Sequence, residues 1–170
     1  MFGVSCPVCG RHGAAPCVRC AARLKPPPLL PAPRGLDACR AVLSYEGVGR
    51  ELVSRLKYRN ARAAVPVLAR AMAALVDPDD VDEVTWVPTS AAHRRARGYD
   101  QARLLARAVS HHLRRPCRGL LVRLPGPAQT GLGRAERVVG PGFEVGVRPR
   151  LRVLAVDDVI TTGATMAAAA

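Results

Sequence analysis

Residues 153–165 read VLAVDDVITTGAT, and no other segment limits the fold of this chain as strongly. An apolar, strand-forming run over 151–156 leads into two adjacent acids, Asp157 and Asp158, and then into small polar residues and a helix that starts near Thr162. A buried strand that passes through a short loop into a helix is typical of α/β domains. Ligands of such domains bind at the carboxyl ends of the strands, where the sequence predicts that the two acids lie.

The rest of the chain divides by composition and pattern. A proline-rich run over 26–35 predicts a stiff, extended linker, and strand-like patterns alternate with helix-like patterns over 36–170. The apolar runs predict strands over 41–45, 83–87, 120–124 and 151–156. Helical spacing of apolar residues predicts helices over 48–59, 65–76 and 100–113, and a Gly/Pro-rich composition predicts a loop over 125–142. The alternation predicts an α/β fold with a mainly parallel sheet and flanking helices.

The composition excludes several classes of protein. With 170 residues, 49% of them apolar, the chain is long enough for one domain with a small appendage and too apolar for a disordered protein. It contains no run of about 18 uncharged apolar residues, so we expect no membrane span. Cys6 and Cys9 stand where the apolar region of a signal peptide would begin, so we expect a cytoplasmic protein.

The net charge of +13 comes almost entirely from arginine, which supplies 24 of the 26 basic residues. A basic excess is typical of proteins that bind nucleic acid. It also follows from the codon usage of a GC-rich genome, which would explain the many alanines as well. Charge alone therefore does not assign a nucleic-acid partner.

Residues 1–25 hold two CxxC pairs that are separated by seven residues. The pairs are Cys6 with Cys9 and Cys17 with Cys20. Each pair can present two thiolates from a tight turn, and four thiolates complete a tetrahedral metal site with no open position. Thiolates favour zinc or an iron–sulfur cluster, and the closed site favours structural zinc in a small zinc-ribbon-like module. Free thiols or a redox pair are the alternatives, and His12 is an alternative ligand.

A predicted phosphate cradle follows the acidic pair. It consists of Thr161, Thr162, Gly163, Ala164 and Thr165. Hydroxyls, a flexible glycine and the free N–H groups of a helix start are groups that bind a phosphate dianion. Acids beside such a cradle suit sugar hydroxyls or a magnesium ion, so the combination predicts a sugar phosphate as the ligand. The plainer alternative is a polar, capped turn behind a buried strand.

The segment closely resembles the motif with which type I phosphoribosyltransferases bind phosphoribosyl pyrophosphate, or PRPP. The resemblance implies a type I phosphoribosyltransferase-like fold. It also implies that Asp157 and Asp158 hold the ribose 2′- and 3′-hydroxyls and that residues 161–165 wrap the 5′-phosphate. Magnesium would enter together with PRPP.

Further elements resemble the ComF family, whose members join an N-terminal cysteine module to a phosphoribosyltransferase-type domain. These elements are Tyr45–Gly47, Leu56–Tyr58, a block with Val87, Pro88, Arg94, Arg97, Gly98, Tyr99 and Gln101, and a block with Gln129, Leu132, Glu136 and Arg137, followed by Phe143. The resemblance covers nearly the whole chain in order. It implies a role in DNA uptake during natural competence, with single-stranded DNA and a helicase-like protein as partners.

The chain departs from the family pattern at three places. Asp100 stands where an asparagine is usual, and Val139 and Gly140 occupy a region where another asparagine is usual. The chain ends at Ala170, whereas family members complete the last helix and add a strand. We therefore expect that the C-terminal end of the domain is missing.

The segment over 93–123 carries nine arginines and one acid. Three of them, Arg94, Arg95 and Arg97, follow a predicted strand, and we expect them in a loop. There they would bind pyrophosphate or the backbone of a nucleic acid. The arginines within 114–118 are interpreted as a solvated basic surface.

The sequence thus predicts a ComF-like, PRPP-binding protein, and it leaves turnover open. As an enzyme it would be a phosphoribosyltransferase whose acceptor is unknown. The alternative is a nucleic-acid-binding accessory that has the same fold and no turnover. A third hypothesis is that the cysteine module docks a partner.

Overall fold

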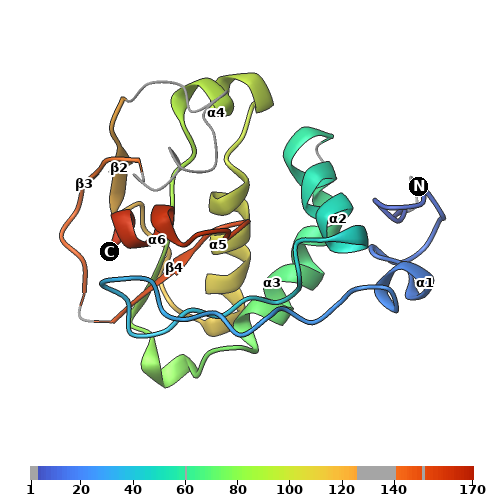
Figure 1. The fold of residues 1–170 in the computed structure, drawn as a ribbon, viewed down its shortest axis with the longest axis horizontal. Coiled ribbons are helices and arrows are strands. Elements are labelled where there is room, and N and C mark those ends of the chain that lie inside the picture. The colour runs from blue at the N-terminus through green and yellow to red at the C-terminus, as the bar shows by residue number, and fades with distance from the viewer. Residues whose placement is uncertain (1–3, 60, 126–140, 151) are drawn as a thin grey trace.

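The computed structural model describes residues 4–59, 61–125, 141–150 and 152–170 (Figure 1). Its helices are α1 (Val18–Ala21), α2 (Gly47–Tyr58), α3 (Val65–Ala73), α4 (Ala91–Arg97), α5 (Gln101–Leu113) and α6 (Ala164–Ala169), with 3₁₀ turns η1 (Arg62–Ala64) and η2 (Pro78–Asp80). Its strands are β1 (Glu83–Trp86), β2 (Leu121–Arg123), β3 (Phe143–Val145) and β4 (Val153–Val156). Within these ranges no helix combines the length and the apolar character needed to cross a membrane.

A short parallel pair of strands lies at the centre of the fold. Strands β1 and β4 pair in parallel, with Glu83 opposite Val153 and Trp86 opposite Val156. On the other side of β1, Cys117 forms a parallel bridge with Val84. Strands β2 and β3 form a separate antiparallel pair. The predicted α/β class is confirmed, whereas the described parallel sheet has only two strands instead of forming a larger sheet.

Helix α5 packs against this pair, α3 packs against α5, and α2 joins the same buried core (Figure 1). The core residues are Leu52, Leu56, Ala64, Leu68, Ala69, Ala73, Val81, Val84, Leu105, Ala106, Val109, Leu113 and Val156. Their spacing of three or four residues in the helices is the apolar stripe that predicted these helices. Burying each leucine contributes on the order of 2 kcal/mol, so this core holds the helices and the strand pair together.

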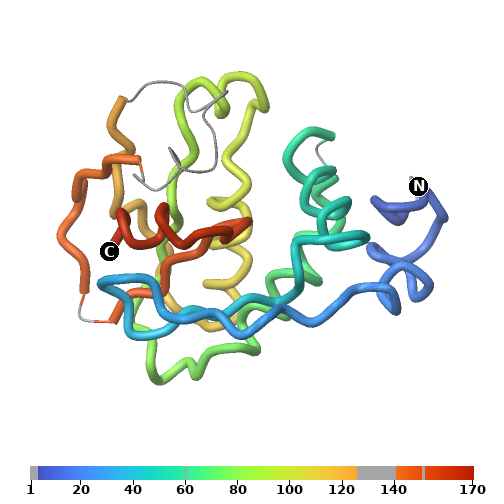
Figure 2. The backbone as a smooth tube through the Cα atoms, viewed as in Figure 1, coloured from blue at the N-terminus to red at the C-terminus, as the bar shows by residue number. Residues whose placement is uncertain are grey.

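The proline-rich segment packs along the molecule. It leaves the cysteine module, runs to the C-terminal helix and returns to α2, as the tube in Figure 2 shows. The backbone N–H of Ser44 donates to the Lys25 carbonyl at 3.0 Å. This hydrogen bond joins the start of the segment to the point at which the chain returns to α2. At its far end, a Cβ on Gly163 would lie 3.1 Å from Pro33 Cγ. The segment therefore contacts the loop that precedes α6.

Three predicted features differ in the structure. Residues 41–45 form no strand. Here the chain returns from the C-terminal helix and enters α2, and the backbone N–H of Ser44 donates to the Lys25 carbonyl. Arg94, Arg95 and Arg97 lie on helix α4, which Ser90 caps by accepting from the backbone N–H of His93, and not in a loop. The predicted strand over 151–156 is observed as β4 over 153–156 and is less buried than expected, because a single strand pairs with it in the described part of the chain.

Part of the Gly/Pro-rich stretch predicted over 125–142 falls on residues 126–140, which lie outside the described residues. The block from Gln129 to Arg137 and the positions Val139 and Gly140 lie there too.

Candidate functional site

The four cysteines predicted as metal ligands lie together. The first pair sits in a hairpin turn closed by a bridge between Ser5 and His12, and Gly10 takes a positive φ of 75° in that turn. The second pair spans the first turn of α1, so only the first pair has the hairpin of a zinc ribbon. The ligand atoms of Cys6, Cys9, Cys17 and Cys20 all lie within 4.8 Å of one another, and His12 is outside the cluster.

These distances fit a tetrahedral metal site. The sulfurs of Cys9 and Cys17 are 3.7 Å apart. Four sulfurs around zinc at a Zn–S distance of about 2.3 Å lie roughly 3.8 Å from one another, so a small contraction completes the site. The cluster could therefore hold one structural zinc ion.

The thiols differ in how readily they lose a proton. Burial opposes ionisation of Cys6, but backbone N–H groups, chiefly that of Cys17, donate to its sulfur and lower its pKa to about 6. Burial and the neighbouring sulfurs raise the pKa of Cys20 to about 12. Cys6 thus ionises more readily than Cys20, and a metal ion would displace the protons that remain on the four thiols.

The acidic pair lies at the carboxyl end of the parallel strands, directly after β4. The Asp157 carboxylate accepts a 2.7 Å hydrogen bond from the backbone N–H of Asp158. Burial and repulsion from Asp158 raise the pKa of Asp157 from 3.8 to about 7. Two carboxylates are therefore held close together in a partly buried place, which a protein tolerates when positive charge is near.

Lys57 supplies such a charge from the last turn of α2. Its Nζ lies 3.0 Å from Asp158 Oδ1, and the side chains of Lys57 and Asp158 are only 17% and 6% exposed. The other carboxylate oxygen, Asp158 Oδ2, is buried and has no hydrogen-bond partner among the described residues. An unpaired buried oxygen costs about 1–3 kcal/mol, so it marks a place where a hydroxyl-bearing ligand would gain affinity.

Further basic side chains gather around the acidic pair. Partial burial and three nearby cations lower the pKa of His93 on α4; these cations are Arg97, Arg123 and Lys57. Arg123 at the end of β2 also lies near Asp157, whose charge partly offsets the lowering of the Arg123 pKa by burial. Arg97 stacks over the Tyr58 ring at 4.9 Å. Elements far apart in the sequence thus bring positive charge to one end of the strand pair.

The predicted cradle lies next to the acidic pair. Residues 159–166 line a cavity of about 20 Å³, which is room for one water molecule. Gly163 has a φ of 77°, a conformation that favours glycine, and the Thr162 hydroxyl accepts from the backbone N–H of Ala164 at 3.4 Å. Thr161 and Thr162 are exposed.

The three arginines predicted to bind pyrophosphate or nucleic acid differ in burial and in their contacts. Arg97 is half-buried and belongs to the basic group around the acids through Tyr58. Arg94 and Arg95 are exposed on the same helix. Sequence reasoning missed the contributions of Lys57 and Arg123. One signal was available for Lys57, because it is one of only two lysines among 26 basic residues.

Asp100 supports the loop that follows β1. Its carboxylate accepts from the backbone N–H of Thr89 at 3.0 Å and from that of Arg103 at 3.2 Å. It thereby caps α5 and ties the end of β1 to it. The residue is buried, so its role in the described structure is to hold these backbone segments in place.

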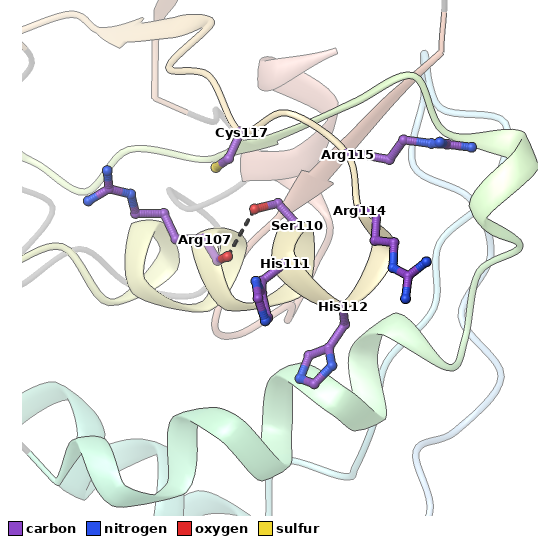
Figure 3. Close-up of a pocket in the computed structure, with 7 residues that line it drawn as sticks. All are labelled: Arg107, Ser110, His111, His112, Arg114, Arg115 and Cys117. Atoms are coloured by element: carbon purple, nitrogen blue, oxygen red, sulfur yellow. Dashed lines mark hydrogen bonds between the residues drawn. The ribbon is translucent and has the colours of Figure 1, made fainter.

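Another depression lies at the C-terminal end of α5 (Figure 3). Its volume is about 790 Å³. The arginine side chains in Figure 3 point away from one another, and the Arg115 guanidinium donates to the backbone carbonyls of Pro78 and Val81. The depression therefore offers no convergent set of groups, and we do not assign it a function.

Comparison of the chain with models of protein families, with curated proteins and with solved structures finds no match. Function is therefore inferred from the geometry of the two clusters and from the residues that form them.

Proposed function

We propose that this chain binds PRPP or a related sugar phosphate at Asp157 and Asp158, as a ComF-like protein with a phosphoribosyltransferase-type domain. The observation that carries the proposal is the buried Asp158 carboxylate, which has one oxygen on Lys57 and the other without a partner among the described residues. A ribose hydroxyl donates to such an oxygen and removes the cost of its burial.

The groups around the acids support the same class of ligand. The cations of Arg97 and Arg123 suit a diphosphate, which arginine binds through paired hydrogen bonds. By the resemblance, Thr161, Thr162, Gly163, Ala164 and Thr165 hold the 5′-phosphate, for which the small cavity of about 20 Å³ has to widen. Arg94 and Arg95 would reach the diphosphate or a nucleic acid from the exposed side of α4, and magnesium would enter bound to PRPP.

If the protein is an enzyme, a nucleophile attacks the anomeric carbon as pyrophosphate leaves. The transition state then carries positive charge on the sugar and negative charge on the departing group. The carboxylates would stabilise the sugar and the basic side chains the pyrophosphate, so catalysis would rest on positioning and electrostatics.

Calorimetric titration of PRPP with magnesium tests the proposal. We expect binding by the wild-type chain and a loss of more than about tenfold in Asp157→Asn/Asp158→Asn, because hydroxyl acceptors and charge are removed. The control is Asp79→Asn/Asp80→Asn, which changes the net charge equally at another adjacent acidic pair that is exposed. Absence of binding by the folded wild-type chain would contradict the proposal.

A DNA-binding experiment on the same variants tests the nucleic-acid alternative. Binding of single-stranded DNA that weakens steeply with salt, and that is equal in the two double variants, would favour an accessory role without a sugar-phosphate site.

We further propose that Cys6, Cys9, Cys17 and Cys20 hold a structural zinc ion that also supports α2. Val48 on α2 packs against three of these cysteines in one buried cluster. We expect one zinc per chain, lost in Cys9→Ser together with thermal stability, since zinc ligation contributes ~10 kcal/mol in small zinc modules. Cys39→Ser, outside the cluster, is the control. Equal zinc content in both variants would contradict the assignment.

A further inference from the structure

Lysine is rare in this chain, and both lysines form ion pairs. The two are Lys25, paired with Glu46 at 3.3 Å, and Lys57, paired with Asp158 at 3.0 Å. Lys57 is the more buried of the two, with 17% of its side chain exposed against 67% for Lys25. The chain has 24 arginines, so the lysine at this buried position suggests a role that arginine would not fill.

The two side chains would bind the carboxylate differently. Lysine is a point charge on a flexible stem and can pair with one carboxylate oxygen, whereas arginine presents a planar fork that pairs with both. In the structure Lys57 takes Oδ1 of Asp158, and Oδ2 has no partner among the described residues. Lysine therefore neutralises the acid and leaves one oxygen for a ligand.

The neighbours of Lys57 fix its position. The preceding residue, Leu56, is fully buried, and its carbonyl accepts a hydrogen bond from the Tyr99 hydroxyl. The following residue, Tyr58, lies under the Arg97 guanidinium. The backbone of α2 at Lys57 is thus held on both sides, within reach of the acidic pair.

Adjacent carboxylates commonly bind a divalent cation, which offsets their repulsion. Here the ammonium supplies part of that offset: Lys57 also stabilises the ionised form of Asp157, against burial and Asp158. We propose that Lys57 is the resident counter-cation of the acidic pair, a positioning residue that leaves the pair open to sugar hydroxyls and closes it to a divalent metal ion of its own. The assignment of the hydroxyls rests on the proposed function. The magnesium that accompanies PRPP would then lie at the diphosphate and not on these carboxylates.

A titration of zinc-loaded protein with Mn²⁺ alone tests whether the acidic pair excludes a divalent metal ion. Electron paramagnetic resonance measures the Mn²⁺ that stays free in solution. Mn²⁺ prefers carboxylates to thiolates, so it reports on the acids and not on the cysteines. We expect no Mn²⁺ bound at the pair in the wild-type chain and none in Lys57→Arg, which keeps the charge. In Lys57→Met we expect affinity for Mn²⁺ to rise by about tenfold or more, and to fall again in Lys57→Met/Asp158→Asn.

Two outcomes would overturn the inference. One is Mn²⁺ binding by the wild-type chain that Asp158→Asn abolishes. The other is no gain of Mn²⁺ affinity in folded Lys57→Met, with Lys57→Gln as a second variant if circular dichroism shows that the methionine variant is unfolded. Neither outcome depends on a sugar ligand.

Titration of ribose 5-phosphate without metal separates this inference from the proposed function. We expect wild-type binding that is weakened about tenfold or more in Lys57→Arg, because the guanidinium fills both oxygens of Asp158. Equal binding by Lys57→Arg would overturn the role given to lysine. No binding by any variant, with the expected Mn²⁺ pattern, would contradict the sugar-phosphate proposal and leave Lys57 as the counter-cation.

Discussion

Glu83 and Asp158 are both buried acids beside the paired strands β1 and β4, but at opposite ends. Glu83 begins β1 at the amino end and is fully buried. Its Oε2 accepts from Arg118 at 3.1 Å, and its Oε1 accepts from the backbone N–H of Arg150. Asp158 follows β4 at the carboxyl end, where Oδ1 pairs with Lys57 and Oδ2 has no partner in the described part of the chain.

The difference separates a structural acid from a binding acid. A buried carboxylate with both oxygens paired has nothing left to offer a ligand, and it fixes the segments that pair with it. A buried carboxylate with one free oxygen lowers the stability of the folded chain by about 1–3 kcal/mol, a cost that a ligand can offset. The amino end of the strand pair is therefore built for stability, and the carboxyl end for binding.

Substituting Glu83 should have the largest effect on stability. In Glu83→Ala, Arg118 and the N–H of Arg150 lose their acceptor inside the protein, so we expect the free energy of unfolding to fall by ~4 kcal/mol. Urea denaturation measures this loss. The control is Asp82→Asn, a neighbouring acid whose pair with Arg152 is partly exposed, so we expect a much smaller loss. Equal losses in both variants would refute the structural role of Glu83.

Asp157 should make stability depend on pH. Its pKa is raised from 3.8 to about 7 in the folded chain, so the folded chain binds more protons than the unfolded one between these values. The stability that this group contributes is complete below about pH 4 and is lost as the pH rises towards 7, by up to ~4 kcal/mol.

Asp157→Asn should therefore be the more stable chain at pH 8 and lose this advantage at pH 4. Asparagine keeps the oxygen that accepts from the N–H of Asp158, so the comparison isolates the charge. Urea denaturation across this range measures the difference, with the exposed Asp79→Asn as control. A constant difference between wild type and Asp157→Asn at every pH would contradict the raised pKa.

The sequence predicted what depends on neighbouring residues. The spacing of two CxxC pairs predicted the cysteine cluster, and the apolar run before Asp157 predicted a strand that ends at the acids. Likewise, the apolar stripes of α2, α3 and α5 predicted those helices. In each of these cases the signal lies within a few residues, so no knowledge of the tertiary structure is needed.

What depends on contacts between distant residues was not predicted. The arginines within 114–118 were interpreted as a solvated surface, yet Arg118 pairs with buried Glu83 and Arg115 donates to carbonyls near η2. An arginine-rich sequence does not reveal which arginine faces a buried acceptor. Lys57 was missed for the same reason, because Asp158 comes to it only in the folded chain.

Asp100 tests whether position or pairing decides the role of an acid. It lies near the carboxyl end of β1, yet both of its oxygens accept from backbone N–H groups, so by pairing it belongs with Glu83. Asn at this position has a single acceptor oxygen and turns an amide N–H towards a backbone N–H. We therefore expect Asp100→Asn to lower the free energy of unfolding by about 1 kcal/mol in urea denaturation.

Ligand affinity then separates the two explanations. Pairing predicts that Asp100→Asn binds ribose 5-phosphate within about threefold of the wild-type chain, while Asp158→Asn loses about tenfold or more. The matched substitution removes one negative charge in each case, at two buried acids near the same end of the strand pair. If both variants lost affinity equally, proximity to the carboxyl end would decide the role, and the unpaired oxygen of Asp158 would carry no special meaning.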